Sequence, residues 1–229
     1  MYKIVRGLKR NPALSLEQIK ARWLAEARKA KLGESPIRKL TLSFSTGEVA
    51  LGGTQPPFDV MVVAYFDRLD QVPGILSGAG ARELQPGGSL VDSSQPGTEI
   101  IAEETLMAAR EGEEGVLNPA GQLKVVRTVF KRHDLTNAQF KDYWLRNHSR
   151  LKGNAIGSPG VKRIVATFAI PCEMPPAIDG MVELYFDSIE HIRKMFSGAV
   201  PGVMRKDEEN FVQMDAPAVR VVAEEYVIR

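Results

Sequence analysis

The sequence predicts an α+β fold made of two copies of a β-α-β-β-α-β unit joined in one chain, because it contains a long internal repeat. The stretch Lys124–Leu151, KVVRTVFKRHDLTNAQFKDYWLRNHSRL, has the pattern of a strand, a turn and an amphipathic helix. Lys3–Leu24, KIVRGLKRNPALSLEQIKARWL, repeats that pattern, with Trp23 and Trp144 lying 121 residues apart. Three further blocks recur at steps of 120 to 124 residues, and such a constant period indicates a duplicated structural unit.

Composition sets the limits on this prediction. The chain has 229 residues, 44% hydrophobic and 25% charged, which is enough for two small domains. The formal net charge is only +2 and basic residues are scattered, so we expect no nucleic-acid partner and no membrane partner. No apolar run approaches the ~20 residues of a membrane helix, and none of signal-peptide length opens the chain. The single Cys172 excludes an internal disulfide framework and favours a cytoplasmic location.

The first half, residues 1–107, begins with a strand followed by a capped helix. Ser15 and Gln18 form an S-x-x-Q capping box, Gly33 ends the helix, and Asp67 is expected to cap a second one. The apolar stripe of the first helix consists of Leu16, Ile19, Trp23, Ala27 and Ala30. Strands are expected at 2–9, 37–44, 58–67 and 98–107, with loops at 47–57 and 85–97.

Residues 108–121, AAREGEEGVLNPAG, are charged and contain Gly, Pro and Asn, so we interpret them as a linker. The second half, residues 122–229, then repeats the same order of segments. Thr136 and Gln139 form the capping box of its first helix, and Asp187 is expected to cap its second. Its first strand is expected at 122–131, and the blocks 161–168, 178–192 and 223–225 match 37–44, 58–72 and 102–104 of the first half.

The β-α-β-β-α-β order is that of a ferredoxin-like unit with the strand order 4-1-3-2. Both helices of such a unit lie on one face of its sheet, so two units must hide their uncovered faces. The tandem ferredoxin-like repeats are therefore predicted to pack sheet to sheet, as a single-chain barrel of the dimeric α+β type. Strand edges left exposed by that packing would make a homodimer plausible.

With this architecture, the second half resembles the EthD family of dimeric α+β barrel proteins. The resemblance rests on FKRHDLTNAQFKDYWLRNHSRL (130–151), SPGVKRIVATF (158–168) and DGMVELYFDS (179–188), and it makes the first half a degenerate copy. It implies a small ring compound bound in a pocket of the barrel and histidine acid/base chemistry without metal or organic cofactor. Related proteins include muconolactone isomerases and fungal polyketide dehydratases. The family histidine falls on His148, and its counterpart in the first half is Ala27.

His148 is therefore the first candidate for a catalytic residue. It lies four residues after Trp144 on the inward stripe of the helix, and an imidazole titrates near neutral pH, as a general acid or base requires. The structural alternative is a histidine held by the helix dipole and a carbonyl. Trp144 and the neighbouring Tyr143 are expected to line the same pocket and bind substrate.

Arg127 and Glu183 are the other two catalytic candidates. An arginine facing the sheet interior needs a partner, and Glu183 lies on the adjacent third strand, so a structural Arg127–Glu183 ion pair is one interpretation. The functional interpretation makes Arg127 a clamp for a carboxylate or enolate and Glu183 a base. Tyr185, on the same strand face as Glu183, could present its hydroxyl to a substrate or simply pack. Arg6 holds the position in the first half that corresponds to Arg127, and it is a further candidate for substrate binding. The first half has Val63 in place of Glu183, so Arg6 lacks that glutamate partner.

The sequence thus favours an enzyme of the isomerase, dehydratase or cyclase type, that is, a lyase or isomerase acting without a cofactor. Its small-molecule substrate would be a hydrophobic ring compound, such as a lactone or an aromatic or polyketide-like metabolite of catabolism or secondary metabolism. One alternative is a non-catalytic binding or accessory protein for such a metabolite. Another is a haem protein with His148 as the axial ligand. The three histidines lack metal-site spacing, so no protein metal site is expected.

Overall fold

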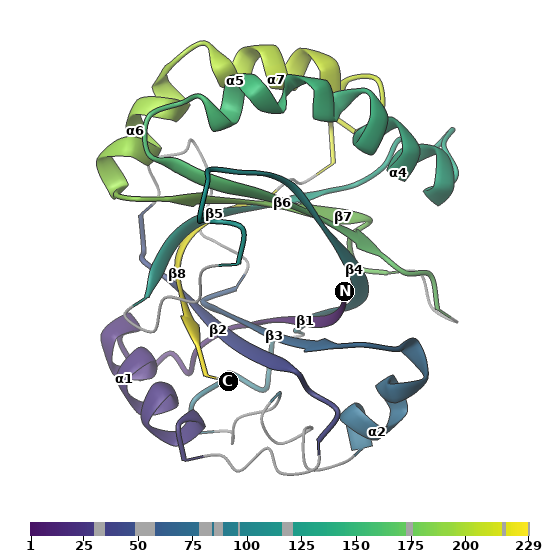
Figure 1. Cartoon of the computed structure of the whole chain (residues 1–229). Coiled ribbons are helices and arrows are strands. Elements are labelled where there is room, and N and C mark those ends of the chain that lie inside the picture. The colour runs from purple at the N-terminus through teal and green to yellow at the C-terminus, as the bar shows by residue number, and fades with distance from the viewer. Residues whose placement is uncertain are drawn as a thin grey trace.

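Eight antiparallel strands form a closed barrel in the order β1-β3-β2-β8-β5-β7-β6-β4 (Figure 1). The computed structural model describes residues 1–29, 35–48, 58–77, 84, 89–95, 97–115, 121–172, 176–216 and 219–228. The strands are β1 Tyr2–Leu8, β2 Lys39–Ser45, β3 Val60–Phe66, β4 Thr98–Ala109, β5 Gln122–Val129, β6 Val161–Ala169, β7 Gly180–Phe186 and β8 Arg220–Val227. An α+β fold with a barrel is therefore confirmed.

Within each half the strand order agrees with the prediction. The first half has the order β4-β1-β3-β2 and the second has β8-β5-β7-β6, which is 4-1-3-2 in both. The halves join through β2–β8 and β4–β6 pairs, and these pairs close the barrel. All eight strands are paired on both sides, so the expectation of exposed strand edges, on which the homodimer rested, is wrong.

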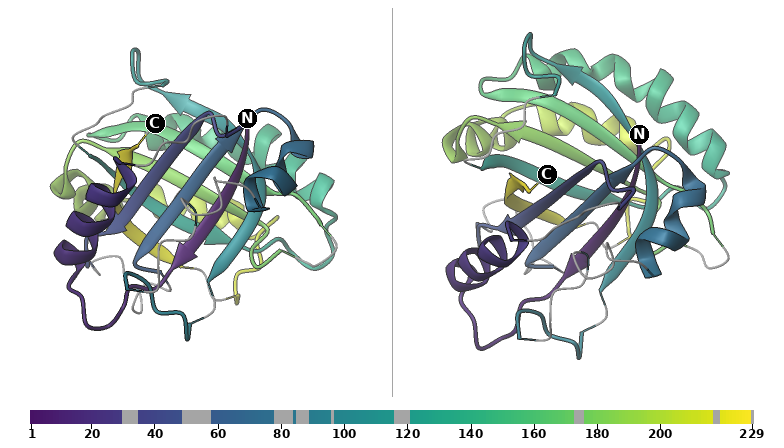
Figure 2. Two further views of the ribbon diagram at one scale, coloured as in Figure 1. Left: turned by 90° about the horizontal axis from the view of Figure 1, so that it is seen from below. Right: turned by 60° about the horizontal axis from the view of Figure 1, so that its bottom comes forward.

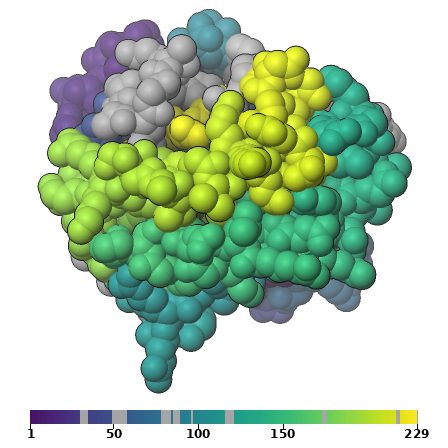
Figure 3. All heavy atoms as spheres, turned by 90° about the horizontal axis from the view of Figure 1, so that it is seen from above, coloured from purple at the N-terminus to yellow at the C-terminus, as the bar shows by residue number. Residues whose placement is uncertain are grey.

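Helices cover the outside of the barrel at two opposite sides (Figures 1 and 2). The first half contributes α1 Leu16–Ala27, the short 3-10 helix η1 Leu69–Gln71 and α2 Val72–Ser77. The second half contributes α4 Asn137–Arg146, η2 His148–Leu151, α5 Lys152–Ile156, α6 Ile189–Ser197 and α7 Val200–Glu208. The chain through α4 and α5 and the chain through α6 and α7 run alongside each other over the sheet of the second half (Figure 3).

Alternation along each strand separates the helix-facing core from the barrel interior. In β3, Val60, Val62 and Ala64 belong to the core under α1 and α2. Met61, Val63 and Tyr65 belong to a cluster inside the barrel that contains residues of both halves. A strand buried on both faces becomes a continuous apolar run, which explains the sequence VMVVAYF.

The helix starts follow from local capping. Both predicted capping boxes are present, Ser15 with Gln18 and Thr136 with Gln139. The expected caps Asp67 and Asp187 are wrong by one residue, because the N-cap positions are Arg68 and Ser188.

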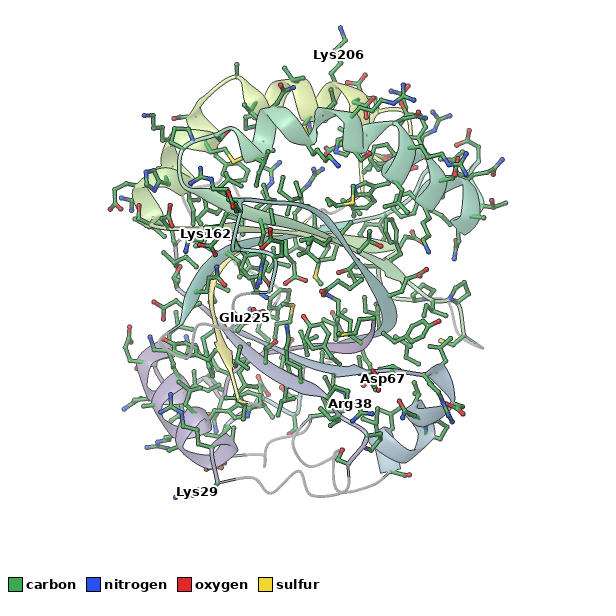
Figure 4. All side chains as sticks on the ribbon, viewed as in Figure 1. Lys29, Arg38, Asp67, Lys162, Lys206 and Glu225 are labelled. Atoms are coloured by element: carbon green, nitrogen blue, oxygen red, sulfur yellow. The ribbon has the colours of Figure 1, made fainter. Side chains whose placement is uncertain are left out.

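Ser188 accepts a hydrogen bond from the backbone N–H of His191, as a cap should. The Asp67 carboxylate instead accepts a hydrogen bond from Arg38 Nε at 2.6 Å, and the two side chains meet at the surface (Figure 4). Ala30 and Gly33, most of loop 47–57 and part of loop 85–97 lie outside the described residues.

The segment between the halves starts later than the predicted linker. β4 continues through Ala108 and Ala109, which pair with Ile164 and Arg163 of β6. Because β4 is longer than predicted, its pairing with β6 extends into Ala108 and Ala109, which their composition had assigned to the linker. The domain limits themselves stay a prediction.

Candidate functional site

A cleft lies between the outer face of the second-half sheet and its helices. The space between these elements amounts to about 900 Å³ when the open solvent at its mouth is included. Strand residues form its floor and the helices form its walls. The apolar lining includes Val125, Val129, Trp144, Ile164, Val182, Leu184, Met195, Phe196, Met204 and Phe211. The charged or titratable lining residues are Arg127, His148, Lys152, Arg205, Glu208 and Arg220.

His148 lies in this cleft because the chain changes course there. Helix α4 ends at Arg146, and His148 begins the 3-10 helix η2, one turn beyond Trp144. Its ring packs against Phe211 with centroids 5.0 Å apart, and it is only 6% exposed. His148 and Trp144 both line this cleft. The pocket, however, lies outside the barrel wall, because the inward stripe of the helix faces the outer side of the sheet.

The His148 ring is held by a carboxylate. Its Nδ1 lies 2.7 Å from Oδ2 of Asp207 in α7, and the Tyr143 hydroxyl donates to Oδ1 of the same carboxylate at 3.1 Å. Burial and the hydrogen bond to Asp207 both raise the pKa of Tyr143. A carboxylate at Nδ1 favours the tautomer with the proton on Nδ1, which leaves Nε2 as the basic nitrogen. Tyr143 thus orients the pair instead of lining the cleft.

Asp207 was missed by the sequence reasoning. It lies in the run RKDEEN, where charges are abundant and nothing in the local pattern distinguishes one acid from the next. The contact joins residues 59 positions apart in sequence, and only the packing of α7 beside α4 and η2 brings them together.

Arg127 faces the cleft, and the predicted Arg127–Glu183 ion pair is wrong. The register places Val126 opposite Glu183 and Arg127 opposite Val182, so the two charged residues point to opposite faces of the sheet. Arg127 instead forms an ion pair with Glu208 of α7 and is 8% exposed. The Arg127 Nε and Glu208 Oε2 atoms are buried without a hydrogen-bond partner among the described residues.

Glu183 and Tyr185 lie inside the barrel. Lys124 Nζ lies 2.6 Å from Glu183 Oε2, and Lys3 Nζ from the first half lies 2.8 Å from Glu183 Oε1. Burial alone would raise the pKa of Glu183, but the charges of Lys124 and Lys3 outweigh burial and hold that pKa well below its ordinary value. Glu183 is therefore a fixed carboxylate, unsuited to act as a base near neutral pH.

The rest of this interior network is almost symmetric between the halves. Lys124 also contacts Glu225 at 2.5 Å, and Lys3 contacts Glu104 at 2.7 Å, so each lysine has its own glutamate. Tyr185 donates to Glu225 and to Glu183 at 3.2 and 3.3 Å. Glu225 points into the space between the two sheets (Figure 4). Tyr185 thus belongs to the network and does not reach the His148 cleft.

Arg6 also lies away from the cleft. It is on the outer face of β1, in the first half, where it forms an ion pair with Glu99 of β4. Of the predicted site residues, the structure therefore brings together His148, Arg127, Trp144 and, through Asp207, Tyr143. It separates Glu183, Tyr185 and Arg6 from them.

The described residues show no cluster of three or more His, Cys, Asp or Glu side chains suited to a metal ion. None of the helices in the described part of the chain has the length and apolar character needed to cross a membrane.

Solved structures with the same architecture place the chain among α+β barrel proteins. An anthrone oxidase-like protein aligns over 99% of this chain and 93% of its own, with a TM-score of 0.69 and 10% identity. Chlorite dismutase from Candidatus Nitrospira defluvii aligns over 97% and 90%, with a TM-score of 0.55 and 12% identity. A monooxygenase-like protein from Lactobacillus acidophilus NCFM aligns over 100% and 94%, with a TM-score of 0.52 and 10% identity. At these identities the likeness concerns the fold.

The family comparison is more specific. Residues 132–215 match the family model of the EthD domain, so the predicted resemblance of the second half to this family is confirmed. The matched range contains His148 and Asp207. A search of curated proteins finds no match.

Proposed function

We propose that the chain is a small-molecule enzyme in which His148 moves a proton to or from a hydrophobic ring compound bound in the cleft. The observation that carries the proposal is the His148–Asp207 pair, with Nδ1 and Oδ2 2.7 Å apart, at the wall of a cleft lined by apolar and charged side chains. A general base needs a ring nitrogen that can accept a proton and a fixed orientation, and this pair supports both. We also propose that the first half is a degenerate ferredoxin-like copy of the EthD unit.

The proposed chemistry is a proton transfer next to a carbonyl, as in an isomerase, dehydratase or cyclase that uses no cofactor. His148 Nε2 would accept a proton from carbon, and Asp207 would stabilise the imidazolium that forms. The negative charge would move to the carbonyl oxygen, where Arg127 would hold it. The imidazolium would then return the proton to another carbon or to a leaving hydroxyl. Lactones and aromatic or polyketide-like ketones fit this description.

The test is a thermal-shift screen of lactones, muconates, hydroxylated aromatics and polyketide-like ketones, followed by a turnover assay of each hit. Because general acid/base catalysis contributes at least ~10²-fold, His148→Ala should fold normally and lose that factor in kcat. Turnover undiminished in His148→Ala would refute the assignment. Ligand binding without turnover, unaffected by the substitution, would instead identify a binding protein for a hydrophobic metabolite.

A haem protein is a second candidate, favoured by the same pair. A histidine that donates Nδ1–H to a carboxylate is the usual arrangement of an axial or metal ligand through Nε2. Much of the cleft lining is apolar, and Arg127, Arg205, Arg220 and Lys152 could hold the haem carboxylates. Haem bound there would supply redox and oxygen chemistry. Titration with haem decides this point, since a Soret band that is lost in His148→Ala supports the haem candidate and no band in the wild type refutes it.

We further propose a cytoplasmic location, because a chain with a single cysteine, Cys172, has no internal disulfide framework, as suits a reducing compartment.

A further inference from the structure

Two arginines lie directly opposite each other at the floor of the cleft. Arg127 of β5 pairs in register with Arg220 of β8, and both side chains line the cleft. In the first half, the same register position holds Arg6 of β1 opposite Glu99 of β4, and these two residues form an ion pair. At this register position the charge is therefore reversed between the halves, because the second half has Arg220 where the first half has Glu99.

This reversal costs stability in the unliganded protein. Like charges directly opposite on neighbouring strands destabilise a sheet, and burial removes the water that would screen them. Glu208 neutralises Arg127, whereas the Arg220 side chain makes no ion pair or hydrogen bond within the described part of the chain. Burial and then the charge of Arg127 lower the pKa of Arg220. Arg205 and Lys152 also line the cleft, so the lining carries an excess of positive charge.

The position of the reversal connects it with the candidate site. The second half has His148 where the first has Ala27, and Arg220 where the first has Glu99. Both replacements line one cleft, although they come from a helix and a strand 72 residues apart. Arg220 is a charged group kept at an energetic cost, and it lies opposite Arg127, whose buried Nε has no hydrogen-bond partner among the described residues. These two observations indicate a site that is completed by a bound anion.

We propose that Arg127 and Arg220 form an anion subsite that binds the carboxylate of an acid with an apolar ring body. The inference deepens the proposed function and rests on it, because it requires that the cleft holds the ligand. A guanidinium group can bind a carboxylate through two parallel hydrogen bonds. The ring body then lies against the apolar walls, where the Arg220 guanidinium is 5.8 Å from the ring centre of Phe196. Small ring acids and haem both carry such carboxylates.

The test uses 2-naphthoate as the probe and uncharged 2-naphthamide as its matched control, with binding measured by calorimetry. The wild type should bind naphthoate at least tenfold more tightly than naphthamide. Arg220→Glu recreates the arginine–glutamate pair of the first half, so it should unfold at the same or a higher temperature and lose the preference for naphthoate. Arg220→Gln, which removes the charge without adding an acid, should lose the preference too. Glu99→Arg, the reverse change in the first half, should lower the unfolding temperature and keep the preference.

The outcomes separate this inference from the proposed function. The inference is overturned if the wild type shows no preference for naphthoate over naphthamide. It is also overturned if that preference survives in both Arg220 variants. His148→Ala should keep the preference, so failure of His148 in turnover leaves the anion subsite standing. A comparison of haem with its dimethyl ester, followed by the Soret band, tests whether the carboxylate belongs to haem. If it does, the ester should bind the wild type more weakly than haem does, and the two ligands should bind Arg220→Glu equally.

Discussion

Lys3 reaches from the first strand across the barrel to Glu183, with Nζ 2.8 Å from Oε1. Glu183 thereby binds one lysine from each half, since Lys124 holds its other oxygen. Its counterpart in the first half is Val63, so one acidic residue serves both lysines of an otherwise duplicated network. The contact ties the two halves together at a depth where neither lysine side chain is exposed.

Glu183→Gln should destabilise the protein strongly without affecting the cleft. Removing the acid leaves two buried ammonium groups with one fewer negative charge, and breaking a buried pair costs about 3–5 kcal/mol. Urea unfolding measures the loss. Glu224→Gln is the control, because the Lys20–Glu224 pair is about one-third exposed and such pairs contribute about 0–1 kcal/mol. Equal losses in the two variants would contradict the structural role of Glu183.

The same carboxylate should make stability depend on pH in acid. The pKa of Glu183 is well below its ordinary value in the folded protein, so the unfolded chain takes up the proton first. The stabilisation is complete above the unfolded pKa and is lost as pH falls below about 4.5, at up to about 1.4 kcal/mol per pH unit for one proton.

Acid titrations of the free energy of unfolding should therefore be steeper for wild type than for Glu183→Gln below pH 4.5, and parallel between pH 6 and 8. Parallel curves in acid would show that Glu183 keeps an ordinary pKa.

Asp207→Asn should change the tautomer of His148 while leaving the fold intact. The carboxylate accepts the Nδ1 proton, whereas an amide can present a donor there and favour the proton on Nε2. Nitrogen NMR of the imidazole reports the tautomer without any substrate. With a substrate, kcat should fall at least ~10²-fold. Tyr143→Phe keeps the carboxylate and should have a much smaller effect; a tautomer unchanged in Asp207→Asn would refute the orienting role.

Gly160→Ala and Gly153→Ala should have opposite effects on stability. Gly160 has φ +76° and its added Cβ would overlap the His191 ring, so a cost of at least ~1–2 kcal/mol is expected. Gly153 lies in α5, and an added Cβ would meet nothing within 4 Å. Alanine there should stabilise by about 0.5–1 kcal/mol. Thermal unfolding of both variants checks the contrast, and destabilisation by Gly153→Ala would contradict it.

Much of the fold follows from local patterns. The capping boxes at Ser15 and Thr136 and the apolar stripes arise from neighbours in sequence, and the recurrence of segments about 121 residues apart repeats them. Together these patterns specified the elements and their order. The helix starts at Asp67 and Asp187 were missed by one residue, because Asp is a preferred N-cap whereas the chain uses the next position.

For the candidate site, the sequence could predict only those residues that lie close together along the chain. His148 and Trp144 could be placed together because four residues make one helical turn. Asp207, Glu208 and Arg220 were not found, since each lies on an element distant in sequence from His148. Asp207 and Glu208 also lie in a run of charged residues, where the local pattern does not distinguish one acid from the next.

The sequence by itself determined the α+β class and the placement of His148 one turn beyond Trp144 on the same side, because helical and strand periodicities are properties of the local chain. The tertiary structure decided which side of the sheet each charged side chain faces. A difference of one residue in register turns a strand side chain to the opposite face, so Arg127 lies in the cleft with His148 and Glu183 lies inside the barrel. The strand register and the packing of α7 made that assignment, and both depend on contacts between the distant parts of the chain.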